Sequence, residues 1–155
     1  MHAFVAAGAS FLLAVLWFDL MFDVQTRRNA EEPLPADVLA SISAYYRRVT
    51  TDARPMSTLI PLVMLATLIA IVLEIANGDG PGWIAWASLA LAASAIGLAM
   101  ARTVRNARRL GGASDPPAVQ TRLARSIYRD HQYCFAAMLL LAGLQLTLAL
   151  VPRIP

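Results

Sequence analysis

The arginines of this chain are confined to two stretches, and this segregation limits its fold more than any other feature. Of the 13 basic residues, all arginine, five lie between Arg27 and Arg54, seven lie between Arg102 and Arg129, and Arg153 is the last. Charge is expensive in the hydrocarbon core of a bilayer and cheap at its edges. Four apolar segments lie beside and between the arginine stretches: residues 3–22, 56–76, 83–100 and 133–151.

Each apolar segment is long enough to cross a membrane as a helix. A hydrocarbon core about 30 Å thick needs about 20 helical residues. The chain is 58% hydrophobic and 15% charged, whereas soluble domains have about 45–50% and about 25%. The apolar runs do not alternate with period two, so a membrane β-barrel is excluded. We therefore predict an all-α integral membrane four-helix bundle, with residues 1–155 as a single transmembrane domain.

The distribution of arginines also predicts the orientation of the bundle. The first and third loops carry the two arginine stretches, whereas the second loop, residues 77–82, carries none. The positive-inside rule then places loops one and three in the cytoplasm and both termini outside. We expect a multi-pass protein of the bacterial inner membrane, with anionic lipid headgroups as partners. The basic stretches contain no nucleic-acid-binding motif.

The first loop contains a further predicted helix. Pro33 and Pro35 interrupt the chain, and Asp37 can cap the segment after them. That segment carries an amphipathic stripe. The helix could lie flat on the inner leaflet, or it could pack on the end of the bundle, and the sequence leaves both open. The stripe consists of Val38, Leu39, Ile42, Tyr45, Tyr46 and Val49.

The third and fourth helices are expected to continue beyond their apolar parts. After the third span the first helix breaker is the pair Gly111-Gly112. The fourth helix can start near a cap at Asp115 and meets no breaker before Pro152. It would then run for about 35 residues, or about 50 Å. We predict a long antiparallel hairpin that projects into the cytoplasm.

Small residues recur at a spacing of four in the first and third spans. This pattern lets helix backbones approach closely in lipid, although alanine is also simply common in this chain. We expect both spans to face protein rather than lipid. The two triplets are Ala6, Ser10 and Ala14, and Ala93, Gly97 and Ala101.

Charged side chains from all four helices meet near the expected inner boundary. Asp19 and Asp23 are four residues apart and so lie on one helix face. Asp19 falls about a turn inside the lipid, where a bare carboxylate is costly. We expect it to point into the bundle and to pair with Arg102 or Arg105. By the same spacing rule, Arg102, Arg105 and Arg109 share a face.

Two interpretations of this charged layer remain open. The charges can be ion pairs that hold the helices in register, or they can form a polar pocket at the cytoplasmic mouth. In the pocket, Asp19, His131 and Arg102 are the candidate catalytic residues, with His131 as the acid or base near neutral pH. Candidate binding residues are Asp23, Arg54, Arg105, Asn106, Arg129 and Asp130.

A metal ion is a third use of the same residues. Two carboxylates and one imidazole, from Asp19, Asp23 and His131, form a known ligand set. Many arginines compete for those carboxylates, and we therefore assign no metal site. The sequence also identifies no cofactor.

A few motifs resemble those of a known family. Arg105-Asn106 ends the third span, and Arg129-Asp130-His131 opens the fourth. With the long first loop, this layout resembles the small four-span anthrone-oxygenase-like membrane proteins, a family of largely unknown function. In that family an asparagine and a histidine are expected at such places, so only Asn106 and His131 carry over. The resemblance implies a cofactor-free oxygenase acting on an aromatic polyketide, or an uncharacterised relative.

The sequence departs from that family at two places. Residues 132–134, Gln-Tyr-Cys, follow the histidine where a further arginine is expected. Acidic Asp19 and Asp23 also stand in the first span.

Three functions are compatible with the sequence. The leading one is a non-enzymatic accessory subunit that forms a homo-oligomer or joins a larger membrane complex. The second is a membrane enzyme that acts on an apolar substrate at the cytoplasmic pocket. The third is a small oligomeric transporter or channel with Glu74, Gln145 and Asp19 as polar stations. Gln145 is otherwise an interhelical hydrogen-bonding residue, and Glu74 could reach the headgroups or Arg153.

The predicted orientation can be tested by thiol labelling. In a chain with Cys134→Ala, we expect Ser114→Cys to react with a membrane-impermeant maleimide only from the cytoplasmic face. Asp79→Cys in the second loop is the matched control and should react only from the periplasmic face. Labelling of Ser114→Cys from the periplasmic face would overturn the topology.

Overall fold

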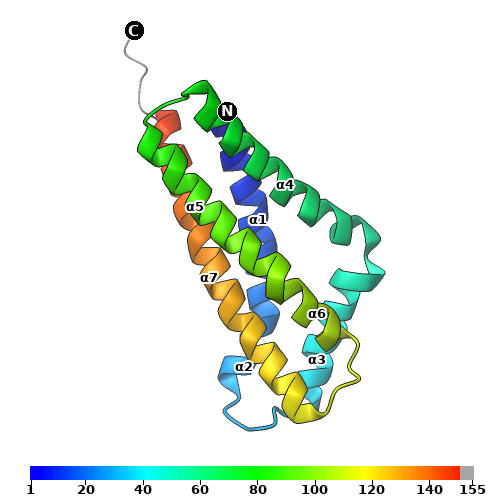
Figure 1. The fold of residues 1–155 in the computed structure, drawn as a ribbon. Helices are drawn as coiled ribbons and strands as arrows, with labels where there is room; N and C mark the ends of the chain where they lie inside the picture. The colour runs from blue at the N-terminus through cyan, green and yellow to red at the C-terminus, as the bar shows by residue number, and fades with distance from the viewer. Residues whose placement is uncertain (151–155) are drawn as a thin grey trace.

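The computed structural model describes residues 1–150, except for the side chains of residues 149 and 150, and this part is helical without any strand. Four long helices run side by side (Figure 1). They are α1 (His2–Asp23), α4 (Arg54–Asn77), α5 (Gly82–Leu98) and α7 (Pro117–Leu150). Shorter segments come after α1 and α5: α2 (Gln25–Arg28), α3 (Ala36–Arg47), η1 (Arg48–Asp52), η2 (Ala99–Thr103) and α6 (Val104–Gly111).

Four helices are long and apolar enough to cross a membrane, which confirms the predicted number of spans and the all-α class. Large apolar side chains on their outer faces, such as Leu62, Trp86 and Leu140, are exposed. The connection between α4 and α5 is the tight turn expected at residues 77–82. Gly78 allows this turn because its φ of 64° lies in the left-handed region.

The core of the bundle lies between α1 and its neighbours α4 and α7. Fully buried Val5 and Ala9 of α1 belong to the same apolar cluster as Met138 and Leu141 of α7. Gly8 lies against Thr67 of α4 so closely that a Cβ there would collide with the threonine side chain. Small residues thus bring α1 next to α4, as tight packing without a hydrophobic driving force requires.

Of the six small residues that we expected at helix contacts, only Ala6 is half-buried, and the other five are exposed. Ser10 and Ala14 of α1 are exposed, and so are Ala93, Gly97 and Ala101 on α5. The helix α5 has small residues on two faces, and spacing alone does not distinguish them. Its inner face uses a different set: Ala85, Ser88, Ala92 and Ala95.

The helix α3 packs on one end of the bundle, which we call the arginine-rich end and which holds α2, α3, α6 and the first half of α7 (Figure 1). Its residues Leu39, Ile42 and Tyr46 are buried in a second apolar cluster. Their partners there include Leu110 of α6 and Ile127 of α7. The amphipathic helix therefore exists, and its apolar stripe faces protein instead of lying free on a surface.

The helix that begins as α5 continues to Gly111, and the next runs from Pro117, so the long third and fourth helices are confirmed. Five residues, Ala99–Thr103, form a π-helical turn within the third helix. Such a turn holds one extra residue and rotates the part of the helix after it. Arg102 lies inside it, so the regular spacing that put Arg102 on one face with Arg105 and Arg109 does not apply.

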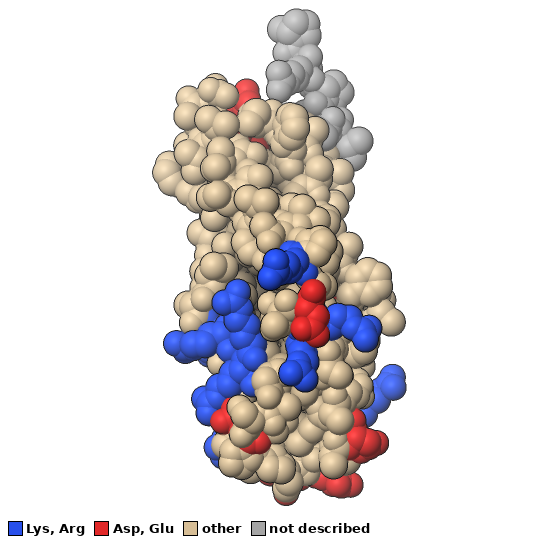
Figure 2. Space-filling model, turned by 90° about the vertical axis from the view of Figure 1, so that its right-hand side faces the viewer, with Lys and Arg blue, Asp and Glu red and all other residues tan. Residues whose placement is uncertain are grey.

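The face of the molecule in Figure 2 shows how the charges are distributed. The arginines gather over one half of this face, and most of the other half is uncharged. This separation reflects the two arginine stretches of the sequence, since α2, α3, α6 and the start of α7 all lie at one end.

The close approach of α6 to α3 gives a testable consequence. A Cβ added at Gly111 would lie 2.7 Å from the backbone nitrogen of Arg47. Because that neighbour is backbone, we expect Gly111→Ala to destabilise the fold by about 1–3 kcal/mol. Gly97→Ala, where a Cβ meets nothing within 4 Å, is the matched control and should not. Thermal unfolding in detergent measures the difference, and equal melting temperatures for the two variants would contradict the packing.

Candidate functional site

A cavity of about 650 Å³ opens beside α1, between α4 and the helix formed by α5, η2 and α6. This volume lies in the range of small-molecule sites, about 300–1,000 Å³. Its lining is mostly apolar, and both π-helical segments contribute to it. Pro61 lines it as well, and a proline inside a helix leaves the carbonyl four residues earlier without its donor. Representative apolar lining residues are Leu12, Leu16, Ile60, Met64, Ile96 and Met138.

His131 of α7 lines the cavity, and its imidazole ring is fixed by a contact with Asp23. Its Nδ1 lies 2.7 Å from Oδ2 of Asp23, whose side chain is 0% exposed. The hydroxyl of Tyr46 donates to the other oxygen of Asp23, Oδ1, at 2.6 Å. Because an imidazole Nδ1–H is the donor that a carboxylate requires, Asp23 orients the ring and leaves Nε2 on the side away from it.

Asp19 lies on the other side of the His131 ring. Its Oδ2 is 3.8 Å from Nε2 of His131, and its Oδ1 accepts a hydrogen bond from the Tyr45 hydroxyl at 2.7 Å. In the described part of the chain no arginine lies within ion-pair distance of Asp19. The expected pairing with Arg102 or Arg105 was therefore wrong, because the Tyr45 hydroxyl bonds to Asp19 and the His131 imidazole, not a guanidinium, faces it.

Arg102 is paired with a different carboxylate. Its guanidinium donates two hydrogen bonds to buried Asp130, which also accepts a bond from Thr103 at 3.0 Å. The Arg102 side chain is 51% exposed and does not line the cavity. It ties the π-helical turn η2 to α7, which is a structural contact.

Of the other predicted binding residues, one lines the cavity and three lie outside its lining. Arg105 lines the cavity, and Arg108 does so as well. Arg54 is exposed at the start of α4, and Asn106 lies outside the cavity lining. Arg129 borders a separate hollow of about 420 Å³ with three other arginines: Arg27, Arg122 and Arg125.

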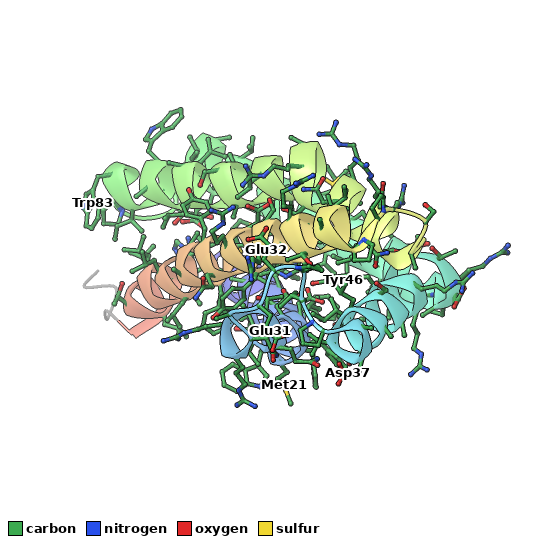
Figure 3. All side chains as sticks on the ribbon, turned by 90° about the horizontal axis from the view of Figure 1, so that it is seen from below. Met21, Glu31, Glu32, Asp37, Tyr46 and Trp83 are labelled. Carbon is green, nitrogen blue, oxygen red and sulfur yellow. The ribbon has the colours of Figure 1, made fainter. Side chains whose placement is uncertain are left out.

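The two tyrosines of α3 were not foreseen as site residues. The sequence placed Tyr45 and Tyr46 on an apolar stripe, and a buried tyrosine hydroxyl usually needs a hydrogen-bond partner. This requirement could have identified them from the sequence, since the carboxylates of α1 were expected nearby as acceptors. Seen from below in Figure 3, Tyr46 lies between α3 and α7, whereas Met21 and Asp37 lie at the periphery.

Both tyrosines remain protonated donors. Burial, together with the charges of Asp23 and Asp19, raises the pKa of Tyr46 well above its usual value. Burial and the neighbouring Asp19 carboxylate likewise raise the pKa of Tyr45. An uncharged phenol can donate to a carboxylate without adding charge to an apolar site, and each tyrosine thereby stabilises one aspartate.

The geometry does not favour a shared metal ion at this place. Asp19 and Asp23 face opposite nitrogens of the same imidazole, so the three groups do not converge on one point. Among residues 1–150, no group of three or more His, Cys, Asp or Glu side chains could hold a metal ion.

Comparisons with known proteins gave no further assignment. No family model, no curated protein and no solved structure matches this chain. The interpretation of the site therefore depends on its own geometry.

The Tyr46–Asp23 hydrogen bond predicts a measurable loss of stability. Tyr46→Phe leaves a fully buried carboxylate with one donor fewer, which should cost about 1.5–3 kcal/mol. Tyr45→Phe is the matched control, and we expect a smaller loss because Asp19 is 14% exposed and water can replace the phenol. Unfolding in detergent, followed by circular dichroism, compares the two, and an equal or smaller loss for Tyr46→Phe would contradict this role.

The raised tyrosine pKa values also predict how the stability of the fold depends on pH in alkaline solution. The unfolded chain loses its phenolic protons near pH 10, while the raised pKa values keep both tyrosines protonated in the folded state. Their stabilising contribution is complete below that pH and is lost as the pH rises further. Tyr46→Phe should therefore show a weaker alkaline loss than the wild type.

Proposed function

We propose that the chain is an integral protein of the bacterial inner membrane, with the arginine-rich end in the cytoplasm and both termini outside. Two observations support this topology. Four helices are long and apolar enough to cross a membrane, and 12 of the 13 arginines lie in the segments 27–54 and 102–129, which gather at one end of the bundle. Arginine on cytoplasmic loops is the usual determinant of orientation, and anionic headgroups would be the first partners of this end.

Within that topology, we propose that the cavity binds an apolar molecule and that His131 moves a proton to or from it. The observation that carries this proposal is the apolar cavity whose wall includes His131 and Asp19, with Asp23 buried behind the imidazole. Exposed apolar residues at its margin, Phe18 and Met100, would let the molecule enter from the bilayer.

The roles of the three side chains follow from their atoms. Asp23 accepts the Nδ1–H of His131, so Nε2 carries the lone pair that can accept a proton from the bound molecule. The imidazolium formed in this way would lie between two carboxylates, Asp23 and Asp19, and is stabilised by both. Tyr46 and Tyr45 are positioning residues, because they bond to the carboxylates and act through them.

The resemblance to anthrone-oxygenase-like proteins supports one class of substrate. An anthrone is a flat apolar ring system with a weakly acidic C–H group, which suits an apolar cavity with one base. In the overall reaction, anthrone and O₂ give anthraquinone and water. The protein would take the C–H proton on Nε2 of His131 and return it when the oxygenated intermediate loses water. The sequence supports this assignment through Asn106 and His131, of which only His131 lines the cavity.

An accessory role without catalysis is a second proposal, supported by the exposed small-residue face of α5. Ala93, Gly97 and Ala101 are exposed there, and such residues let another helix approach closely. This face would serve either a second copy of the chain or a larger membrane partner. None of these three residues lines the cavity, so the two proposals are compatible.

The catalytic proposal predicts that His131→Gln and Asp19→Asn remain folded and lose turnover. With anthrone in proteoliposomes, we expect oxygen uptake and anthraquinone formation to fall by about 10²- to 10⁴-fold in His131→Gln, the usual range for removal of a general base. Arg109→Gln, which breaks the Arg109–Asp115 pair and changes no residue of the cavity lining, is the control and should keep wild-type turnover. Wild-type turnover in both site variants would remove the proposal.

A further inference from the structure

A second polar cluster lies at the other end of the bundle, opposite the arginine-rich end. Each of the four long helices contributes one side chain: His2 from α1, Glu74 from α4, Ser88 from α5 and Gln145 from α7. Glu74, Ser88 and Gln145 are 0% exposed. The His2 side chain is 13% exposed and therefore connects the cluster with the outside of the protein.

The nitrogen atoms of Gln145 and His2 that face Glu74 both approach the same carboxylate oxygen, Oε1. Gln145 Nε2 lies 3.3 Å from Glu74 Oε1 and 3.0 Å from the Ser88 hydroxyl. His2 Nδ1 lies 3.1 Å from the same Oε1 and 3.2 Å from Gln145 Oε1. The second oxygen, Oε2, is buried and has no hydrogen-bond partner among the described residues.

An unpartnered carboxylate oxygen is difficult to maintain in such a place. A buried charge needs a partner for each of its oxygens or must be neutralised. Within residues 1–150, the only titratable group that faces the Glu74 carboxyl group is His2, because α5 and α7 offer the neutral side chains Ser88 and Gln145. The neighbouring carboxylate of Asp79 lies 3.6 Å from the N-terminal amine instead. A proton on the carboxyl group would remove the charge, and a neutral carboxyl group costs less to bury than a carboxylate.

We propose that Glu74 and His2 form a proton-binding site. A proton from the outside binds the partly exposed imidazole of His2. It then passes from Nδ1 to the Glu74 carboxylate, which turns an ion pair into two neutral groups. The imidazole can then accept another proton, so Glu74 exchanges protons with the outside through His2.

The donor arrangement favours a proton over a metal cation. Two of the groups nearest to Glu74 Oε1 are the N–H groups of Gln145 and His2, which repel a cation. A proton needs no further ligands, and His2 is the group that can deliver it. The cluster also explains the location of Gln145, whose amide joins α4 to α5.

The site can be tested on the unmodified chain in native membranes. Dicyclohexylcarbodiimide, an apolar reagent, adds to a protonated carboxyl group and rearranges to a stable N-acylurea without a leaving group. We expect mass spectrometry of digested protein to find this adduct on Glu74, with a labelling rate that falls several-fold as the buffer is made alkaline. A water-soluble carbodiimide should not label it, because the carboxyl group is buried.

Three variants separate the possible results. Glu74→Gln should lose the adduct, while Asp79→Asn, which alters the neighbouring carboxylate, should keep it with the same pH dependence. His2→Gln should slow the response of labelling to a change in pH, because the exposed carrier is missing. Absence of label on Glu74 at every pH, or a rate independent of pH, would overturn the proposal. Protection by Na⁺ at constant pH would replace the proton by a metal cation and would overturn it equally.

Discussion

A polar side chain buried among apolar helices must find its partners within the protein, and this requirement organises both ends of the bundle. At one end, Asp23 receives donors from His131 and Tyr46. At the other, Glu74 receives them from His2 and Gln145. Apolar side chains from all four long helices fill the space between. This apolar layer separates the two polar clusters within the bundle.

Much of the architecture could be predicted because its causes are local. The length of an apolar run determines a span, and the pair Gly111-Gly112 ends the third helix, so both depend only on neighbouring residues. The amphipathic stripe of α3 was equally visible. Whether that stripe faces lipid or protein depends on α6 and α7, which lie far away in the sequence, and only the structure decided it.

The sequence predicted which residues form the candidate site and their level along the bundle, but not which side chains bond to one another. The sequence brought Asp19, Asp23 and His131 to one level, and the structure places them together. It paired Asp19 with Arg102 or Arg105, whereas Arg102 bonds to Asp130 and Asp19 bonds to Tyr45. Two physical reasons explain the error: a π-helical turn rotates Arg102, and two hydroxyls from α3 satisfy the carboxylates. The spacing of residues along one helix reveals neither a π-helical turn in that helix nor the position of α3, which folds back against the bundle. For Glu74 the sequence left open the headgroups or Arg153. Arg153 lies outside the described residues, and within them the contact of Glu74 is with His2.

The helix α7 carries a residue of each polar cluster on one continuous rod. His131 and Gln145 are fourteen positions apart in a helix that has 34 residues, which separates them by about 21 Å along its axis. A rod of this kind transmits displacement with little loss, since its backbone bonds resist stretching. Sliding α7 by a fraction of a turn would change the distance from His131 to Asp23 and from Gln145 to Glu74 in the same movement. The two polar clusters therefore share one helix backbone, and a shift of α7 along its axis would alter the contacts at both.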